Sequence, residues 1–231
     1  RLINTKVAGG GGGCTDIVNE FDPFGDSSGY ALYQLNGDAT DESTNYNGIS
    51  VNNVTWGGAG VFGTSGAFNG SNSIITLPDN IETPLRNTNE FTITGWFNTT
   101  TTSTRQGILS FYQDVYIYVE VNASGVLGAS VANSVGTQTS PLGTTQLSPN
   151  TWYNFAFTAK AGKVNLYLNG SSEASLTTWN GSYFTNSNIT PKIGTSTTSF
   201  FSGSIDQVRV FDRALDPLEV EALYTEELCI C

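Results

Sequence analysis

Short segments in which apolar and polar residues alternate recur along the chain, and turn-forming residues separate them. This pattern constrains the fold more than any other feature, because a period of two places successive side chains on opposite faces of a β-strand. The alternation is clearest, with aromatic residues, in segments 91–97 and 151–159. Segment 163–168 is followed by Asn169-Gly170, a dipeptide typical of a tight β-hairpin turn. Strands are predicted over residues 31–35, 65–68, 73–77, 91–97, 107–111, 116–121, 151–159, 163–168, 191–193 and 204–211.

One helix is predicted, near the C-terminal end. Asp216 is a suitable N-cap, Pro217 fits the first helical position, and Glu219 completes a capping box. Many antiparallel strands followed by one short helix predict an all-β fold, an antiparallel jelly-roll β-sandwich. We expect Trp96 and Trp152, which lie within strand patterns, to be buried between its two sheets.

Composition and charge narrow the range of partners. Hydrophobic residues make up 38% and aromatic residues 12% of the 231 residues, enough for a sizeable core, whereas charged residues make up only 13%. The formal net charge of −11 argues against binding to nucleic acid or to anionic lipid, because both carry negative phosphate groups. No apolar stretch is long enough to cross a membrane, so no membrane partner is expected.

Changes in composition mark the expected domain boundaries. Residues 1–29 include a run of glycines at 9–13 and are predicted to be a linker or N-terminal arm. Residues 30–225 are predicted to form the β-sandwich, and residues 226–231 a C-terminal joint that leads to a further unit.

Three cysteines, Cys14, Cys229 and Cys231, lie near the two ends of the chain. The ends of a sandwich domain often emerge close together, so a disulfide from Cys14 to Cys229 or Cys231 is one interpretation. Free thiols and pairing with another chain are the alternatives.

Four stretches, in this order, resemble the laminin-G-like, concanavalin-A-like jelly-roll domains found in secreted and virion proteins. They are 32–41 (LYQLNGDATD) with 45–48 (NYNG), 62–63 (FG) with 67–70 (AFNG), 147–153 (LSPNTWY) with 166–170 (LYLNG), and 203–215 (GSIDQVRVFDRAL). The resemblance covers about residues 30–225 and implies the same sandwich fold. The first stretch is similar to units in tail and surface proteins of aquatic bacteriophages, which can occur in tandem between Cys- and Gly-bearing joints.

The resemblance implies a non-enzymatic glycan-binding or adhesion module on a virion surface, as part of an extracellular tail or fibre protein. Its partners would be a host surface glycan and other virion proteins, with a homo-oligomer as one form of assembly. Two other functions stay open: a purely structural domain that decorates or spaces the virion, and a secreted bacterial adhesin or glycoside hydrolase relative. A ligand site needs an exposed Trp or Tyr beside polar groups, whereas a spacer buries such aromatics at contacts.

No enzyme activity is expected from the residue types. The chain has no histidine, which excludes Ser-His and Cys-His catalysis and any His-based zinc site. The related sandwich endoglucanases carry the pattern Glu-x-Asp-x-x-Glu, whose alternation brings acid and nucleophile into one cleft, where retention of configuration needs them about 5 Å apart. Here the nearest approach is Glu20 with Asp22, but Gly25 stands at the third position and the segment precedes the domain.

Asp206 is the first candidate metal ligand. Unbroken alternation through 204–211 would place its carboxylate on the apolar face that carries Val208, where it needs hydrogen bonds or a cation. In sandwich glucanases a comparable Asp helps to hold calcium, so the resemblance implies a structural Ca²⁺; backbone N–H bonds are the alternative. Asp38 and Asp41, in a polar loop, could supply further oxygens or could be ordinary turn residues.

The candidate ligand-binding residues lie in the polar loop 177–184, outside the stretches that resemble the family. Trp179, Tyr183 and Phe184 could present aromatic faces on which a sugar ring stacks. The alternative is that Trp179 folds onto the edge of the sandwich.

Overall fold

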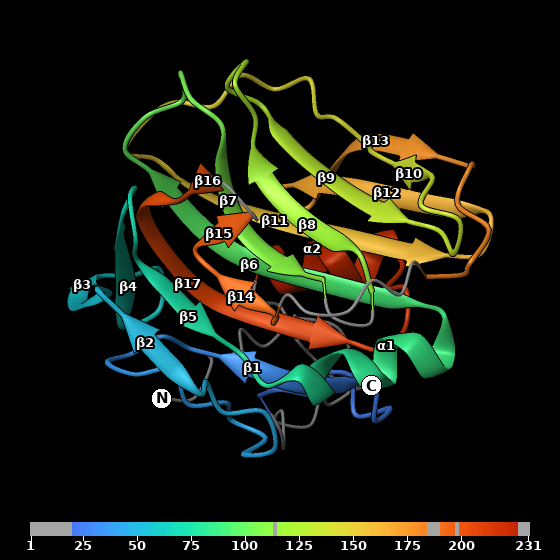
Figure 1. Ribbon diagram of the computed structural model, residues 1–231, viewed down its shortest axis with the longest axis horizontal. Helices are drawn as coiled ribbons and strands as arrows, with labels where there is room; N and C mark the ends of the chain where they lie inside the picture. Colours follow the sequence, from blue (N-terminus) through green and yellow to red (C-terminus); the bar gives the residue numbers. More distant parts are fainter. Residues whose placement is uncertain (1–19, 113–114, 184–189, 197–198, 226–231) are drawn as a thin grey trace, which may run out of the picture.

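Two antiparallel β-sheets pack face to face in the computed structural model, which describes residues 20–112, 115–183, 190–196 and 199–225 (Figure 1). The eight-stranded sheet has the order β13-β12-β11-β6-β17-β4-β3, with β1 paired beside β17. The seven-stranded sheet has the order β10-β9-β8-β7-β14-β5-β2. The predicted all-β antiparallel sandwich is therefore confirmed.

The strands of both sheets are short. The eight-stranded sheet comprises β1 (Gly29–Tyr33), β3 (Thr55–Ala59), β4 (Thr64–Asn69), β6 (Phe91–Thr99), β11 (Trp152–Lys160), β12 (Lys163–Leu168), β13 (Ser171–Leu176) and β17 (Ser202–Phe211). The seven-stranded sheet comprises β2 (Ser50–Asn52), β5 (Ile74–Thr76), β7 (Gln106–Phe111), β8 (Ile117–Val121), β9 (Leu127–Ala132), β10 (Gln138–Thr139) and β14 (Lys192–Ile193). A separate hairpin is formed by β15 (Thr195–Ser196) and β16 (Ser199–Phe200). All ten predicted strands are present, with bounds within two residues of those expected.

Helices occupy only three short segments of the described chain. A 3₁₀-helix, η1 (Asp79–Glu82), leads directly into α1 (Thr83–Thr88), and neither was predicted. The predicted C-terminal helix is α2 (Pro217–Thr225). Among the described residues, no helix is long and apolar enough to cross a membrane.

The main core lies between the sheets. Phe97 and Phe155, from β6 and β11, are fully buried with ring centres 6.3 Å apart. They belong to one cluster with Val119 and Val131, which come from β8 and β9 of the other sheet. The core therefore draws side chains from both sheets.

Helix α2 covers the outer face of the eight-stranded sheet. Leu223 of α2 belongs to a second buried cluster with Phe211 of β17. Trp96 is only 8% exposed, and its ring centre lies 5.6 Å from that of Tyr224 in α2. Trp96 is therefore buried under the helix instead of between the sheets, and Trp152 is only half-buried. The predicted position of the two tryptophans is wrong, because alternation does not show which face a helix will cover.

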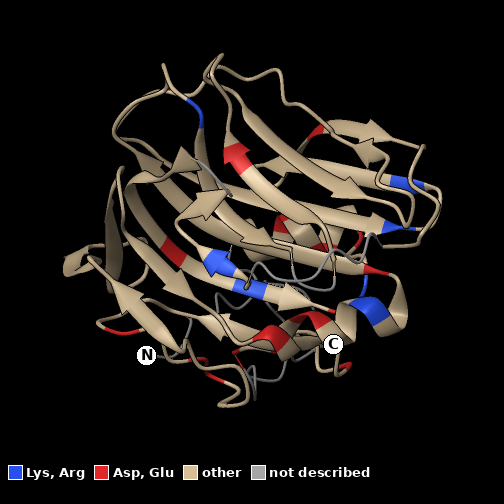
Figure 2. Ribbon diagram, viewed as in Figure 1, with Lys and Arg blue, Asp and Glu red and all other residues tan. Residues whose placement is uncertain are grey.

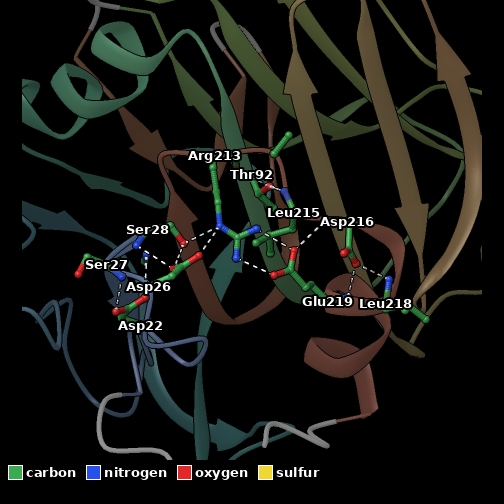
Figure 3. A network of polar contacts seen from close by, with 12 residues as sticks. Asp22, Asp26, Ser27, Ser28, Thr92, Arg213, Leu215, Asp216, Leu218 and Glu219 are labelled. Carbon is green, nitrogen blue, oxygen red and sulfur yellow. Dashed lines mark hydrogen bonds and ion pairs between the residues drawn. The ribbon is translucent and has the colours of Figure 1, made fainter. Parts of the chain in front are cut away.

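Arg213 connects the N-terminal part of the described chain to α2 (Figure 3). Its Nη1 and Nη2 atoms donate to the two carboxylate oxygens of Glu219, at 2.7 and 2.6 Å. Its Nε atom donates to Asp26 Oδ2 at 2.7 Å and to Ser28 Oγ at 3.0 Å. Residues 20–28, expected within a linker or arm, therefore pack against the sandwich.

The start of α2 has the predicted capping box. Asp216 Oδ1 accepts the N–H groups of Leu218 and Glu219, at 2.8 and 2.9 Å. In return, the Asp216 N–H donates to Glu219 Oε2 at 2.8 Å. Glu219 thus binds both the helix start and Arg213, so one carboxylate joins the cap to the N-terminal segment.

Candidate functional site

Asp206 does not face the core, because a β-bulge interrupts β17. The pairing of β17 with β6 shifts register between Asp206 and Arg209, and Gln207 has a positive φ of 52°. Asp206 pairs directly opposite Trp96 on the outer face, whereas Val208 belongs to the inner core. The expectation that Asp206 and Val208 share a face is wrong, since it assumed unbroken alternation.

The Asp206 carboxylate holds the turn between β3 and β4. Its Oδ2 atom accepts the N–H groups of Val61 and Phe62 at 2.8 and 3.0 Å, whereas its buried Oδ1 forms no hydrogen bond with the described residues. Burial raises the pKa of Asp206 to about 6, against the opposing effect of those N–H groups, that of Gln207 and the charge of Arg209. Calcium needs six to eight oxygen ligands, whereas the groups bonded to Oδ2 of this carboxylate are N–H donors. Calcium binding stays an untested prediction.

The other two expected metal ligands are turn residues. Asp41 is fully buried, and its oxygens accept hydrogen bonds from the N–H groups of Leu32 and Tyr46 and from Ser43. Asp38 is exposed and accepts the Thr40 N–H at 2.8 Å. The described residues contain no group of three or more His, Cys, Asp or Glu that could hold a metal ion. The structure therefore does not bring Asp38, Asp41 and Asp206 together as one site.

Trp179 is part of the main core instead of an exposed platform. Its side chain is 1% exposed, its Nε1 atom donates to the Ser182 carbonyl at 3.0 Å, and its ring lies 6.2 Å from that of Phe91. Tyr183 is 5% exposed and packs against Trp179 with ring centres 5.1 Å apart. The expected stacking faces of Trp179 and Tyr183 are thus covered. Burial in the core removes the large apolar ring of Trp179 from water, which is more favourable than exposing it in the loop.

Several predicted residues cannot be placed. Phe184, Cys14, Cys229 and Cys231 lie outside the described residues. The three interpretations of the cysteines therefore stay open.

A different group of aromatic and polar side chains gathers on the outer face of the seven-stranded sheet. Tyr112, Tyr116 and Tyr118 pack edge-on or tilted, with ring centres 4.7 to 6.4 Å apart. Tyr116 is half-buried, and Tyr112 and Tyr118 are 4% and 8% exposed. We call this surface the tyrosine face; its residues are Arg105, Ser110, Tyr112, Tyr116, Tyr118, Glu120, Ser130, Gln138, Ser140 and Lys192.

Hydrogen-bonding side chains lie beside the tyrosines. Gln138 Nε2 donates to the Tyr116 hydroxyl at 3.2 Å, and Ser130 Oγ lies 2.9 Å from Ser140 Oγ. Gln138 and Ser140 are exposed at the β10 edge of the sheet. Amide and hydroxyl groups of this kind can both donate to and accept from the hydroxyls of a ligand.

An ion pair borders the other end of the tyrosine face. Arg105 Nε donates to Glu120 Oε2 at 2.5 Å, and the Arg105 guanidinium lies 5.6 Å from the centre of the Tyr118 ring. Burial raises the pKa of Glu120, although Arg105 opposes this effect. Burial, and secondarily the charge of Glu120, raise the pKa of the Tyr118 hydroxyl. The face thus places the Tyr118 phenol beside a carboxyl group that is paired with Arg105.

Sequence reasoning missed the tyrosine face, although part of its signal is present. In the predicted strand 116–121, Tyr116, Tyr118 and Glu120 alternate with Ile117 and Val119. This alternation predicts that the two tyrosines and the glutamate share the outward face of the strand. What the sequence does not show is that β7 and β9 place Tyr112 and Ser130 beside this set. The ligand-binding site was predicted at Trp179, in a loop. In the structure, the exposed polar and aromatic side chains instead lie in or beside strands of the seven-stranded sheet.

Comparison with known proteins agrees with this architecture. The family model of the concanavalin A-like lectin/glucanases superfamily matches residues 69–221, more than half of the chain. The chain therefore belongs to this superfamily of lectin-like and glucanase-like sandwich domains. A search of curated proteins finds no match.

Several solved structures share the fold. Domain 4 of AbnA, a GH43 extracellular arabinanase from Geobacillus stearothermophilus solved in complex with arabinotriose, has a TM-score of 0.69 and 22% identity, covering 84% of this chain and 97% of that domain. A structure of botulinum neurotoxin type C, whose cell entry depends on two ganglioside molecules, has a TM-score of 0.65 and 16% identity, covering 88% of this chain and 52% of that one. The botulinum neurotoxin type G receptor-binding domain has a TM-score of 0.62 and 22% identity, covering 87% and 51%. This chain thus spans about half of the toxin chains, and at these identities the likeness shows the fold alone.

Proposed function

We propose that this chain is a non-enzymatic glycan-binding module whose ligand contacts lie on the tyrosine face. The observation that carries the proposal is the combination of a half-buried Tyr116 with Gln138, Ser140 and Arg105, all partly or fully exposed, in or beside the strands of one sheet. Sugars bind to protein surfaces through ring packing on aromatic side chains and through hydrogen bonds to polar groups. Two of the solved structures with this fold are described with an oligosaccharide or with gangliosides, which supports the same class of ligand here.

The number of carboxylates on the tyrosine face supports glycan binding without hydrolysis. Among the described residues of this face, Glu120 is the only carboxylate, and it is paired with Arg105. A retaining glycoside hydrolase uses two carboxyl groups about 5 Å apart, and an inverting one uses two groups somewhat farther apart. One charge-paired glutamate supplies neither arrangement.

We further propose that the module acts outside the cell, in adhesion of a virion to a host surface glycan as part of a tail or fibre protein. The resemblance of residues 32–41 to bacteriophage units supports this setting. A purely structural domain in the virion is the second candidate, favoured by the burial of Trp179 and Tyr183. The two candidates differ in whether the tyrosine face has a ligand.

The test is a glycan-array screen with the purified protein, followed by titration of each hit with the Tyr116→Ala variant. Removal of one packed ring should weaken binding about fivefold, since an aromatic contact contributes about 1 kcal/mol beyond the buried area. Trp152→Ala, which removes a half-buried aromatic from the other sheet, is the matched control and should bind as the wild type does. Circular dichroism verifies that both variants are folded.

Two results would overturn this proposal. Equal binding by wild type and Tyr116→Ala would move the site away from the tyrosine face, and absence of any hit would favour the structural domain. Release of reducing ends from a bound glycan over time would show that the domain is an enzyme. Trp179→Ala is unsuitable as a test, because loss of a core tryptophan costs about 3–5 kcal/mol of stability wherever the ligand binds.

A further inference from the structure

The charge of the tyrosine face is opposite in sign to that of the whole chain. The chain has 20 acidic and 9 basic residues, a formal net charge of −11. On the tyrosine face the described charged residues are Arg105, Lys192 and Glu120, two basic and one acidic, which leaves a net charge of +1. Figure 2 shows how few charges lie on β7 to β10, with one acidic segment at the end of β8 and one basic segment on β14. This surface is therefore one part of an acidic protein that an anion can approach.

Lys192 supplies a positive charge that is not neutralised within the described part of the chain. It lies directly opposite Ser110 in the pairing of β14 with β7, and both side chains point to the tyrosine face. The Lys192 ammonium forms no ion pair with the described residues. The buried Ser110 Oγ likewise has no hydrogen-bond partner among them. Because directly opposed residues have Cβ atoms about 5 Å apart, two donors without acceptors are neighbours here.

We propose that the ligand of the tyrosine face is an acidic polysaccharide whose sugar rings carry carboxylate groups. This rests on the proposed function and adds the class of ligand. One carboxylate accepts from the Lys192 ammonium while its ring packs against the half-buried Tyr116. The Lys192 ammonium then has the partner that the described residues do not provide.

A second basic group lies at the start of β7, the strand that pairs with β14. Arg105 immediately precedes β7, and five residues at about 3.3 Å each place it roughly 17 Å from Ser110. Its side chain is 51% exposed. Its Nε atom binds Glu120, which leaves other N–H groups of the guanidinium for a ligand. Two basic groups spaced along a strand fit a chain of acidic sugars better than a single acidic sugar.

The negative net charge of the protein does not prevent such binding. At about 0.1 M ionic strength the Debye length is about 10 Å, so carboxylates on distant surfaces are largely screened. The charges nearest to a bound ligand then determine its electrostatic interaction with the protein, and on the tyrosine face most of them are positive. The same argument makes the attraction dependent on salt.

The experiment compares each acidic polymer with its neutral methyl ester. The pairs are polygalacturonate, hyaluronate and polysialate with their carboxyl-esterified forms, titrated by calorimetry against wild type, Lys192→Gln and Lys163→Gln. Lys163 is an exposed residue of β12 on the other sheet and serves as the matched control. At least one acidic polymer should bind about tenfold more tightly than its ester. Lys192→Gln should remove most of that preference, Lys163→Gln should not, and the preference should shrink as salt rises from 50 to 500 mM.

The outcomes separate this inference from the proposed function. Binding of neutral glycans that depends on Tyr116 but not on Lys192 would leave the proposed function in place and overturn the acidic class. A preference for the acidic polymer that persists in Lys192→Gln would also contradict the inference, as would absence of binding to all three acidic polymers.

Discussion

The Asp206 carboxylate is the residue whose environment departs most from what its sequence position suggests. It is fully buried, with one oxygen bonded to the turn between β3 and β4 and the other without a hydrogen bond in the described part of the chain. A bulge at Gln207 turns it out of the core and under Phe62 and Trp96, whose rings lie 6.3 Å apart. No local sequence pattern shows this bulge, because Gln207 is an ordinary residue in a region of φ that Gly or Asn usually adopts.

Asp206 should make the protein more stable as the pH falls from 7.5 to 5. Its pKa is raised from 3.8 to about 6 in the folded state, so the folded state binds a proton more tightly than the unfolded state over this range. Between pH 7.5 and 5 this difference corresponds to about 1.4 kcal/mol. We expect the free energy of unfolding of the wild type, measured in urea, to gain up to this amount on acidification relative to Asp206→Asn. The exposed Asp38→Asn serves as the control, and equal pH slopes in all three proteins would contradict the prediction.

The same pair of proteins tests the calcium hypothesis. If Asp206 binds Ca²⁺, millimolar calcium should raise the Tm of the wild type and leave that of Asp206→Asn unchanged, because a ligand that binds only the folded state stabilises it. No calcium effect on either protein would leave Asp206 as a carboxylate held by N–H donors.

At the scale of elements, the sequence predicts the strands whose two faces differ. β6, β11, β12 and β17 each have an inward apolar set, and their predicted bounds are close to those observed. β13 (SSEASL) and β3 (TWGGA) lie at the ends of their sheet, where few side chains are buried, so they lack that contrast. β9 (LGASVA) is buried throughout but consists mostly of small residues, which weakens the pattern. The tyrosine face was missed for a different reason, since its residues come from separate strands that only the pairing of the sheet brings together.

Helix α2 should depend on the planar guanidinium of Arg213. Two parallel bonds to Glu219 and a third to Asp26 need a fork of N–H donors that lysine does not have. Arg213→Ala should lower the free energy of unfolding by about 2 kcal/mol, a typical cost for losing charged hydrogen bonds. Arg213→Lys should recover only part of this loss in urea denaturation. The exposed Lys160→Ala is the control, and full stability of Arg213→Lys would show that the charge alone suffices.

At the scale of the molecule, the two sheets have different roles. The eight-stranded sheet holds β1 and carries α2 on its outer face, so both ends of the described chain pack against it (Figure 1). The tyrosine face is the outer face of the seven-stranded sheet, on the side of the sandwich opposite α2.

Display in several copies should convert weak binding into firm attachment. A single packed ring and two charge contacts give one domain only modest affinity, whereas linked copies bind a repeating polymer with high effective concentration. We expect a biotinylated protein assembled on tetrameric streptavidin to bind an immobilised acidic polysaccharide about 10²- to 10⁴-fold more tightly than the monomer, as measured by surface plasmon resonance. The gain should come from slower dissociation. A tetramer of Tyr116→Ala should lose most of its binding, because each weakened contact counts once per copy. Equal apparent affinities for monomer and tetramer would show that the polymer does not present repeated sites to this face.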